Sequence, residues 1–239
     1  MNTFELPTNE VQLWHCRFNP QREHLDTFLS LLSDDEKKRA DTFKFKIDRQ
    51  RSIMARGVLR SLLGSYLHRH PRDLQFGYTE YGKPFLRHEP SLRFNLSHSQ
   101  DRAVFAFVRH ADIGVDIEKI NSEFRVMDIA RNFFSSDEIL ALEALPEKER
   151  HEGFYRCWTR KESFIKAKGS GLSFSLRSFS VSLHVDCPEL LHTAWHPSEK
   201  KEWQMVSFRP SEAYLVALSV RGNIHSVVQR DWKATDSLI

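Results

Sequence analysis

Glycine and cysteine are both scarce in this sequence. Glycine accounts for 9 of the 239 residues, roughly half of the usual frequency of about 7%, which disfavours a nucleotide site cradled by a glycine-rich loop. Proline is equally infrequent, at 9 residues, so collagen-like and low-complexity classes are excluded. The 3 cysteines lie at scattered positions and form no Cys-x-x-Cys pair, which favours a reducing compartment over a disulfide framework. We therefore expect a cytoplasmic protein.

Long apolar runs and a strong charge of one sign are absent too. No apolar run approaches the ~20 residues needed to cross a bilayer, so no membrane association is expected. Residues 1–10 include acidic but no basic side chains, which disfavours a secretory signal or a transit peptide. The formal net charge of +3 favours an anionic ligand or an acidic partner, but it is too small to indicate nucleic-acid binding.

The sequence does contain enough apolar material for a core, with 40% hydrophobic and 28% charged residues. The expected elements follow the same order twice: a strand, then helices, then several strands. The first series comprises a strand at 11–18, helices from 33 and over 48–68, and strands near 74–78, 92–96 and 103–108. The second comprises a strand at 113–117, helices over 126–145 and 153–168, and strands at 179–185, 203–208 and 214–220.

This order predicts an α+β fold made of two similar halves, residues 1–110 and 111–239. Each half is expected to contain a strand, helices and then a small antiparallel sheet. No linker rich in Pro, Gly or Ser separates the halves. We therefore expect them to pack tightly, with the active site at their junction.

The clearest chemical signal is a pair of acids in the segment Ile113 to Glu118. Side chains alternate between the two faces of a strand, so Asp116 and Glu118 point to one face and their apolar neighbours to the other. The Cβ atoms of the two acids would lie roughly 6.5–7 Å apart, and carboxylates that close repel one another unless a cation lies between them. Oxygen ligands of this kind favour Mg²⁺. The alternative is an edge strand with a solvated acidic face.

A second signal lies in the segment Trp158 to Lys166. On a helix Glu162 and Lys166 are one turn apart, a spacing that is also typical of ordinary surface ion pairs. Yet large apolar residues are distributed all round this segment, which predicts a helix that is buried on most sides. Charged residues on such a helix indicate a function, because a third carboxylate with Lys161 and Lys166 would complete a site for metal and phosphate.

Small polar donors end a strand-like segment from Phe94 to Ser99. Ser97 and His98 could suggest a hydrolase, but adjacent residues rarely meet as nucleophile and base, and no G-x-S-x-G elbow surrounds them. Their hydroxyl and imidazole groups could instead hold a phosphate, as could Lys83 in the tight turn from Tyr81 to Pro84. The alternative is that Lys83 is an ordinary turn lysine and His98 an ordinary loop histidine.

Together these segments resemble the 4′-phosphopantetheinyl transferase family, of the monomeric type that activates surfactin synthetase and fatty-acid carrier proteins. Four motifs occur in the family's order, and the similarity extends over roughly residues 30 to 185. The matching stretches are Gly82-Lys83-Pro84, Phe94-Asn95-Leu96-Ser97-His98-Ser99, Gly114-Val115-Asp116-Ile117-Glu118, Trp158 to Lys166, Gly169, Gly171, Leu172 and Ser178 to Val181. The family fold is a pseudo-dimer of two α+β halves with the site between them, which implies a monomer here.

The resemblance implies that coenzyme A is the co-substrate and Mg²⁺ the cofactor, with Asp116, Glu118 and Glu162 as metal ligands. A serine of an apo carrier protein attacks the β-phosphate, takes the phosphopantetheine group and releases 3′,5′-ADP. The implied catalytic residues are Asp116, Glu162 and Lys166. Either Glu162 or a metal-bound water removes the serine proton, and Lys166 balances charge on the departing phosphate.

The family contacts the nucleotide and its 3′-phosphate through positions that here carry mostly basic side chains. The implied coenzyme A ligands are Arg39, Arg51, Lys83, Ser97, His98, Lys161 and Lys166. Carrier proteins of this kind are acidic around the modified serine. Two basic clusters, at 37–39 and 160–161, are therefore expected to attract them.

Two other classes of function stay open at this point. A silent module that binds coenzyme A or a carrier protein would not need three retained carboxylates. A metal-dependent phosphodiesterase would release phosphopantetheine without a protein acceptor. The residues favour the transferase, but they do not reveal which carrier pathway is served.

Overall fold

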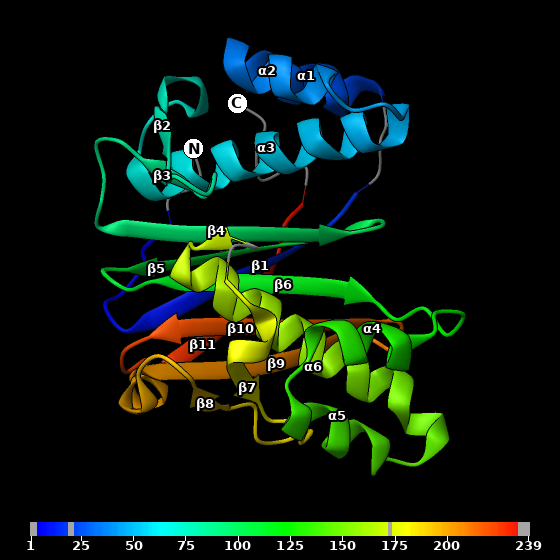
Figure 1. Ribbon diagram of the computed structural model, residues 1–239. Coiled ribbons are helices and arrows are strands. Elements are labelled where there is room, and N and C mark those ends of the chain that lie inside the picture. Colours follow the sequence, from blue (N-terminus) through cyan, green and yellow to red (C-terminus); the bar gives the residue numbers. More distant parts are fainter. Residues whose placement is uncertain (1–3, 19–21, 172–173, 234–239) are drawn as a thin grey trace.

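Two β-sheets lie at the centre of the molecule, with helices on their outer sides (Figure 1). The computed structural model describes residues 4–18, 22–171 and 174–233, so Leu172 lies outside the described residues. The first sheet has the order β11 (Ser226–Asp231), β1 (Glu10–Arg17), β5 (Arg102–Arg109) and β4 (Leu92–Ser99). The second has the order β6 (Ile113–Lys119), β10 (Tyr214–Arg221) and β9 (Trp203–Ser211). Neighbouring strands in both sheets are antiparallel, except that β1 and β11 run parallel.

The helices follow in two groups, one for each sheet (Figure 1). The first group is α1 (Arg22–Leu31), α2 (Asp34–Asp41) and α3 (Lys46–Leu67), and the second is α4 (Val126–Phe133), α5 (Ser136–Glu143) and α6 (Glu147–Lys168). Each group is accompanied by a small hairpin, β2 (Phe76–Tyr78) with β3 (Pro84–Leu86), and β7 (Phe179–Val181) with β8 (Leu190–Thr193). Short 3₁₀ turns η1 (Pro71–Asp73), η3 (Leu176–Ser178) and η4 (Pro197–Glu202) complete the described elements.

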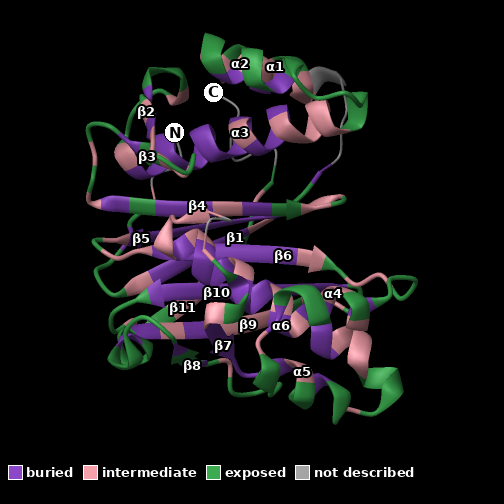
Figure 2. Cartoon of the chain, viewed as in Figure 1, coloured by how far each residue is buried: buried purple, intermediate pink, exposed green. Residues whose placement is uncertain are grey.

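The layers of the fold follow from side-chain alternation along the central strands. In β5 the residues at 103, 105 and 107 pack with α3 and its neighbours, whereas those at 104, 106 and 108 pack against the second sheet. Both faces of this strand are therefore buried, which explains its continuous apolar sequence. Figure 2 shows buried residues concentrated in these inner layers and exposed residues on the outer helices and turns.

The same alternation in β6 decides where the two acids point. Ile113, Val115 and Ile117 belong to the apolar layer between the sheets. Because successive side chains alternate, Asp116 and Glu118 lie on the opposite face of β6. Helix α6 packs on that face.

An equivalent helix arrangement occurs in both halves of the chain. A capping box precedes each long helix, formed by Ser33 with Glu36 and by Ser135 with Glu138. Glu36 pairs with Arg60 of α3, and Glu138 pairs with Lys161 of α6, each at 2.7 Å. Both helices have 22 residues, and each basic residue is the fifteenth, counted from Lys46 and from Glu147. The α+β fold of two similar halves that the order of elements predicts, and the pseudo-dimer that the resemblance implies, are thereby confirmed.

Several boundaries differ from the prediction. The helical stretch predicted over 126–145 is two helices, because the second begins at its own cap after residue 134. The sequence patterns did not predict α1, β3, β8 or β11. Strand β11 pairs with β1 of the first sheet. The C-terminal strand therefore returns to the sheet of the first half, although the predicted second half comprised residues 111–239. In the part of the chain that is described, no helix has the length and apolarity to cross a membrane.

Candidate active site

Helix α6 packs directly against the face of β6 that carries the two acids. Gly114 makes this contact possible: a Cβ atom there would lie 2.1 Å from a carbonyl oxygen and 2.2 Å from an amide nitrogen of the α6 backbone. Backbone atoms cannot turn aside as the end of a side chain can, so only glycine fits at this position. The close approach brings Glu162 and Lys166 of α6 beside Asp116.

Asp116 is the most buried of the three predicted carboxylates, with 3% of its surface exposed. Its Oδ1 accepts hydrogen bonds from Lys166 Nζ at 2.6 Å and from Ser97 Oγ at 2.9 Å. Its other oxygen, Oδ2, is buried and has no hydrogen-bond partner among the described residues. Buried carboxylate oxygens normally have a donor, so this oxygen indicates a ligand position.

Glu118 and Glu162 add negative charge to the same region. Burial, and then the charge of Asp116, raises the pKa of Glu118 to about 7, and Glu118 Oε2 accepts a hydrogen bond from Ser99 Oγ at 2.9 Å. Burial and Asp116 also raise the pKa of Glu162. Its Oε1 is a second buried oxygen without a partner in the described chain. Three partly buried acids from two elements are thus crowded together against their electrostatic preference.

These oxygens fit a hard divalent cation such as Mg²⁺, which takes carboxylate ligands and relieves their repulsion. Within residues 4–18, 22–171 and 174–233, no three acidic, histidine or cysteine side chains are arranged so that they could hold a metal ion by themselves. Mg²⁺ usually keeps water or substrate phosphate in its ligand shell. An incomplete protein set is therefore compatible with this ion.

Ser97 and Lys166 lie beside Asp116, whereas His98 lies on the other face of β4, with its ring 6.1 Å from that of Phe18. Lys166 Nζ donates to Ser97 Oγ at 2.9 Å as well as to Asp116. His98 is exposed at the end of β4. Partial desolvation and the positive charges of Lys166 and Arg51 lower the pKa of His98. The region between β4 and α6 therefore combines acids with cations and neutral donors.

Lys83 lies on the turn between β2 and β3, where it meets both β6 and α6. Its ammonium donates to Ile113 O at 2.9 Å and to Ala167 O at 3.0 Å. Burial lowers the pKa of Lys83 to about 8. Together with Glu162 and Lys166 it lines a cavity of about 200 Å³.

Arg51 and Arg39 come from the helices of the first half. Arg51 pairs with Asp48 at 3.3 Å and contacts Gln100 Oε1 at 3.4 Å, in the turn that follows β4. This places Arg51 near the strand end that carries His98. Arg39 is exposed at the end of α2, and its guanidinium lies 6.0 Å from the centre of the Tyr78 ring.

Lys161 does not join this cluster, and the prediction that it binds coenzyme A is wrong. The side chain is fully buried, and its ammonium donates to both carboxylate oxygens of Glu138 and to Phe179 O, each at 2.7 Å. An ammonium has three N–H donors, so no donor is left for a phosphate. Arg160 is also fully buried and donates to Ser182 and Ser207. Residues 160–161 therefore form no basic surface cluster.

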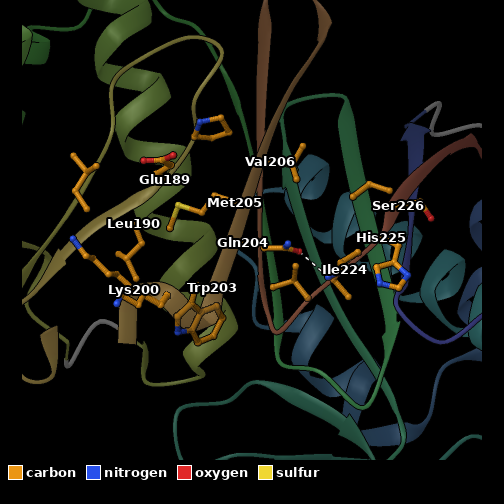
Figure 3. Close-up of a pocket in the computed structure, with 15 residues that line it drawn as sticks. Glu189, Leu190, Lys200, Trp203, Gln204, Met205, Val206, Ile224, His225 and Ser226 are labelled. Carbon is orange, nitrogen blue, oxygen red and sulfur yellow. Dashed lines mark hydrogen bonds between the residues drawn. The ribbon is translucent and has the colours of Figure 1, made fainter. Parts of the chain in front are cut away.

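Two larger hollows differ in their relation to the acids. One, of about 630 Å³, adjoins Glu118 and is lined further by Ser99, Phe124, Tyr155 and Trp158, among others. The other, of about 620 Å³, lies between β8, β9 and the start of β11 and is drawn in Figure 3. None of the predicted site residues lines it.

Two residues beside the acids were not predicted. Asn95 and Ser99 lie on β4 on either side of Ser97, and both form hydrogen bonds to β6. The signal was present as the period-two spacing of polar residues at 95, 97 and 99.

Comparisons with known proteins match almost the whole chain. The model of the 4′-phosphopantetheinyl transferase N-terminal family matches residues 16–110, and that of the 4′-phosphopantetheinyl transferase superfamily matches residues 112–219. The chain is 34% identical over 220 residues to the 4′-phosphopantetheinyl transferase HetI of Nostoc sp., covering 91% of this chain and 90% of that protein. It is 37% identical over 165 residues to the 4′-phosphopantetheinyl transferase Sfp of Bacillus subtilis, covering 69% and 72%.

The chain belongs to the 4′-phosphopantetheinyl transferase family. It is an enzyme that transfers the phosphopantetheine group of coenzyme A to carrier proteins. The family and the activity predicted from the four motifs are confirmed. A silent binding module and a phosphodiesterase are not favoured, because these relatives are named as transferases.

Proposed function

We propose that this transferase depends on Mg²⁺ held by Asp116, Glu118 and Glu162. The observation that carries the proposal is the pair of buried carboxylate oxygens, Asp116 Oδ2 and Glu162 Oε1, that have no partner in the described chain. The raised pKa values of Glu118 and Glu162 support it: burial is the larger cause, the carboxylate of Asp116 adds to it, and a bound cation would offset both. When bound, Mg²⁺ would neutralise charge on the pyrophosphate oxygens of coenzyme A.

Coenzyme A is proposed to bind at the junction of the halves, against β4, α6 and the turn that carries Lys83. Lys166 would balance charge on the departing phosphate, since its ammonium already lies between Ser97 and Asp116. Lys83, Ser97 and His98 are the proposed contacts of the nucleotide and its 3′-phosphate. Arg51 and Arg39 are proposed as further contacts from α3 and α2.

Glu162 is proposed as the base that accepts the proton of the carrier serine. Burial and the neighbouring Asp116 raise the pKa of this carboxyl, which brings it closer to the operating pH and makes the carboxylate a better proton acceptor. Its Oε1 has no donor among the described residues. Because the metal is proposed to take this oxygen, the serine proton would go to the other oxygen of the same carboxylate.

The carrier proteins are proposed to be acidic and to approach the basic end of α2 and the following turn. Lys38 and Arg39 are exposed there. Two more exposed lysines, Lys44 in the turn and Lys46 at the start of α3, lie on either side of Phe45, which is 60% exposed. An acidic carrier with an apolar contact residue would complement this surface.

The enzyme is proposed to act as a monomer in the cytoplasm. Both halves of the site come from one chain, so a second copy is not needed to complete it. All three cysteines, Cys16, Cys157 and Cys187, are free thiols, as expected in a reducing compartment.

Calorimetric titration of coenzyme A tests the metal site directly. We expect MgCl₂ to tighten binding of coenzyme A to the parent enzyme, relative to EDTA, by about tenfold. The Asp116→Asn variant should bind with the same affinity in MgCl₂ and in EDTA. An equal gain from Mg²⁺ in this variant would contradict the proposed ligand set.

A further inference from the structure

Strands β4 and β6 are neighbours that belong to different sheets. Each is the last strand of its own sheet. They run in the same direction, because Asn95 lies beside Val115 and Ser99 lies beside Lys119 (Figure 1). The described hydrogen bonds between them come from the side chains of β4. At this edge, hydrogen bonds from side chains therefore hold the two halves together.

Three β4 side chains at alternate positions make these bonds. Asn95 Oδ1 accepts a hydrogen bond from Val115 N at 2.9 Å, and Ser97 Oγ donates to Asp116 Oδ1 at 2.9 Å. Ser99 Oγ accepts from Lys119 N at 3.2 Å and donates to Glu118 Oε2 at 2.9 Å. One hydroxyl thus contacts both the backbone of β6 and the end of an acidic side chain.

These contacts bracket the acids of β6. On its other edge, β6 is paired with β10 from Ile113 to Lys119. On the edge that faces β4, the backbone N–H of Val115 donates to Asn95 and that of Lys119 donates to Ser99. These two amides lie on either side of the segment that carries Asp116 and Glu118. Ser99 is the one residue of the three that fixes backbone and carboxylate at the same time.

We propose that Ser99 is a positioning residue that orients Glu118 for Mg²⁺, with Asn95 holding the other end of the same strand segment. The inference rests on the proposed metal site. Hydrogen bonds from neighbouring groups orient metal ligands, and their loss typically lowers metal affinity by about 10- to 100-fold. Loss of the Ser99 hydroxyl should therefore weaken the metal site while the fold is maintained, because half-buried Ser99 supports no apolar core cluster.

The test is direct binding of Mn²⁺, a paramagnetic substitute for Mg²⁺, in the presence of coenzyme A and without a carrier. Free Mn²⁺ is measured by electron paramagnetic resonance, so no turnover is required. The informative pair is Ser99→Thr and Ser99→Val, which have nearly the same shape and differ in the hydroxyl. Ser219→Ala is the matched control, because Ser219 is a buried serine that bonds to Ser163 of α6 and touches no acid of the site.

We expect Ser99→Val to raise the Mn²⁺ dissociation constant by about tenfold, and Ser99→Thr and Ser219→Ala to stay within about twofold of the parent. The Mg²⁺ concentration for half-maximal transfer should rise in parallel, with kcat at saturating Mg²⁺ largely retained. Parent-like Mn²⁺ binding by Ser99→Val would overturn the inference. So would unfolding of Ser99→Val at the assay temperature, since the hydroxyl would then be structural. If the parent itself binds no Mn²⁺, the proposed metal site fails first.

Discussion

Lys166 Nζ lies 2.6 Å from Asp116 Oδ1 and 2.9 Å from Ser97 Oγ. A helix of the second half is thereby tied to a strand of each half. The ion pair compensates the buried charge of Asp116. Glu118 and Glu162 have no such cation at hydrogen-bond distance in the described residues, and burial raises the pKa of both carboxyl groups.

The first prediction follows from this imbalance: Glu118→Gln should stabilise the enzyme in the absence of divalent metal. An acid whose folded pKa is raised, here from 4.5 to about 7, destabilises the folded state progressively as pH rises through that window. Above pH 7 the full penalty is present, so the variant should gain roughly 1–3 kcal/mol at pH 8 and much less at pH 5. The measurement is urea unfolding in EDTA at both pH values.

Transfer by the Glu118→Gln variant should be lost at the same time, because the substitution removes a proposed carboxylate ligand of Mg²⁺. Glu212→Gln, in the exposed turn before β10, is the control and should match the stability of the parent at both pH values. Equal stability of Glu118→Gln and the parent at pH 8 would contradict the account of crowded acids.

Gly114→Ala should disrupt the contact between β6 and α6. The added Cβ would lie 2.1 Å from a backbone oxygen of α6, so the helix must move away from the acids. We expect a loss of roughly 2–4 kcal/mol in the free energy of unfolding, as for other overpacked buried sites. Transfer should fall further than stability explains.

The control for this substitution is Gly222→Ala. Gly222 has φ +102° and open space around its Cα, so its replacement carries only the backbone cost of about 1 kcal/mol. Denaturant unfolding and transfer rates are measured for both variants. A Gly114→Ala variant as stable as Gly222→Ala would show that the helix does not pack as closely as described.

Nucleotide binding should depend on pH through the protonation of Lys83. Its pKa is lowered to about 8 by burial, so the free enzyme loses this positive charge as pH rises from 7 to 9. An anionic ligand favours the protonated lysine, so affinity is nearly full at pH 7 and falls as pH rises through 8, by up to about tenfold at pH 9. Titration of 3′,5′-ADP measures this, because phosphate ionisation is nearly complete above pH 7, with a second pKa of about 6.

Lys83→Met should bind 3′,5′-ADP more weakly than the parent, and its affinity should not change between pH 7 and 9. Lys200→Met, outside the proposed site, should keep the pH dependence of the parent. If Lys83→Met retains the same pH dependence, another group is responsible and Lys83 is not a ligand of the nucleotide.

Carrier recognition should weaken as salt is raised. Exposed charges attract over a Debye length of ~10 Å at 0.1 M salt and are screened at higher ionic strength. The apparent Michaelis constant for an acidic apo-carrier should therefore rise with salt, with turnover at saturating carrier much less affected. Lys38→Glu should raise this constant at low salt, whereas Lys201→Glu should not. A Michaelis constant that is flat across salt would indicate mainly apolar recognition, for example through Phe45.

The acids of β6 were predictable because a strand repeats every two residues, so sequence spacing alone assigns a face. A capping box is predictable from spacing too, because its two residues, such as Ser33 and Glu36, lie three positions apart and interact locally. The burial of Lys161 was not predictable from its own segment. Its partner Glu138 belongs to another helix, and only the packing of α5 on α6 removes the lysine from solvent.

The sequence does not predict strand β11, because most of its residues are exposed and follow no alternating apolar pattern. Its pairing with β1 joins opposite ends of the sequence, which local spacing does not reveal. Ser99 was overlooked for a similar reason. Its function depends on the neighbouring strand β6, to which it is linked only by side-chain contacts.

The most direct test of the proposed site is the intact mass of an apo-carrier protein incubated with coenzyme A and enzyme. With Mg²⁺ and the parent enzyme, the carrier should gain the mass of one phosphopantetheine group, and EDTA should prevent this. Glu162→Gln should lower the initial rate by at least about 100-fold while the protein remains folded, and Glu212→Gln should match the parent. Transfer by Glu162→Gln at a rate near that of the parent, or full transfer in EDTA, would contradict the account.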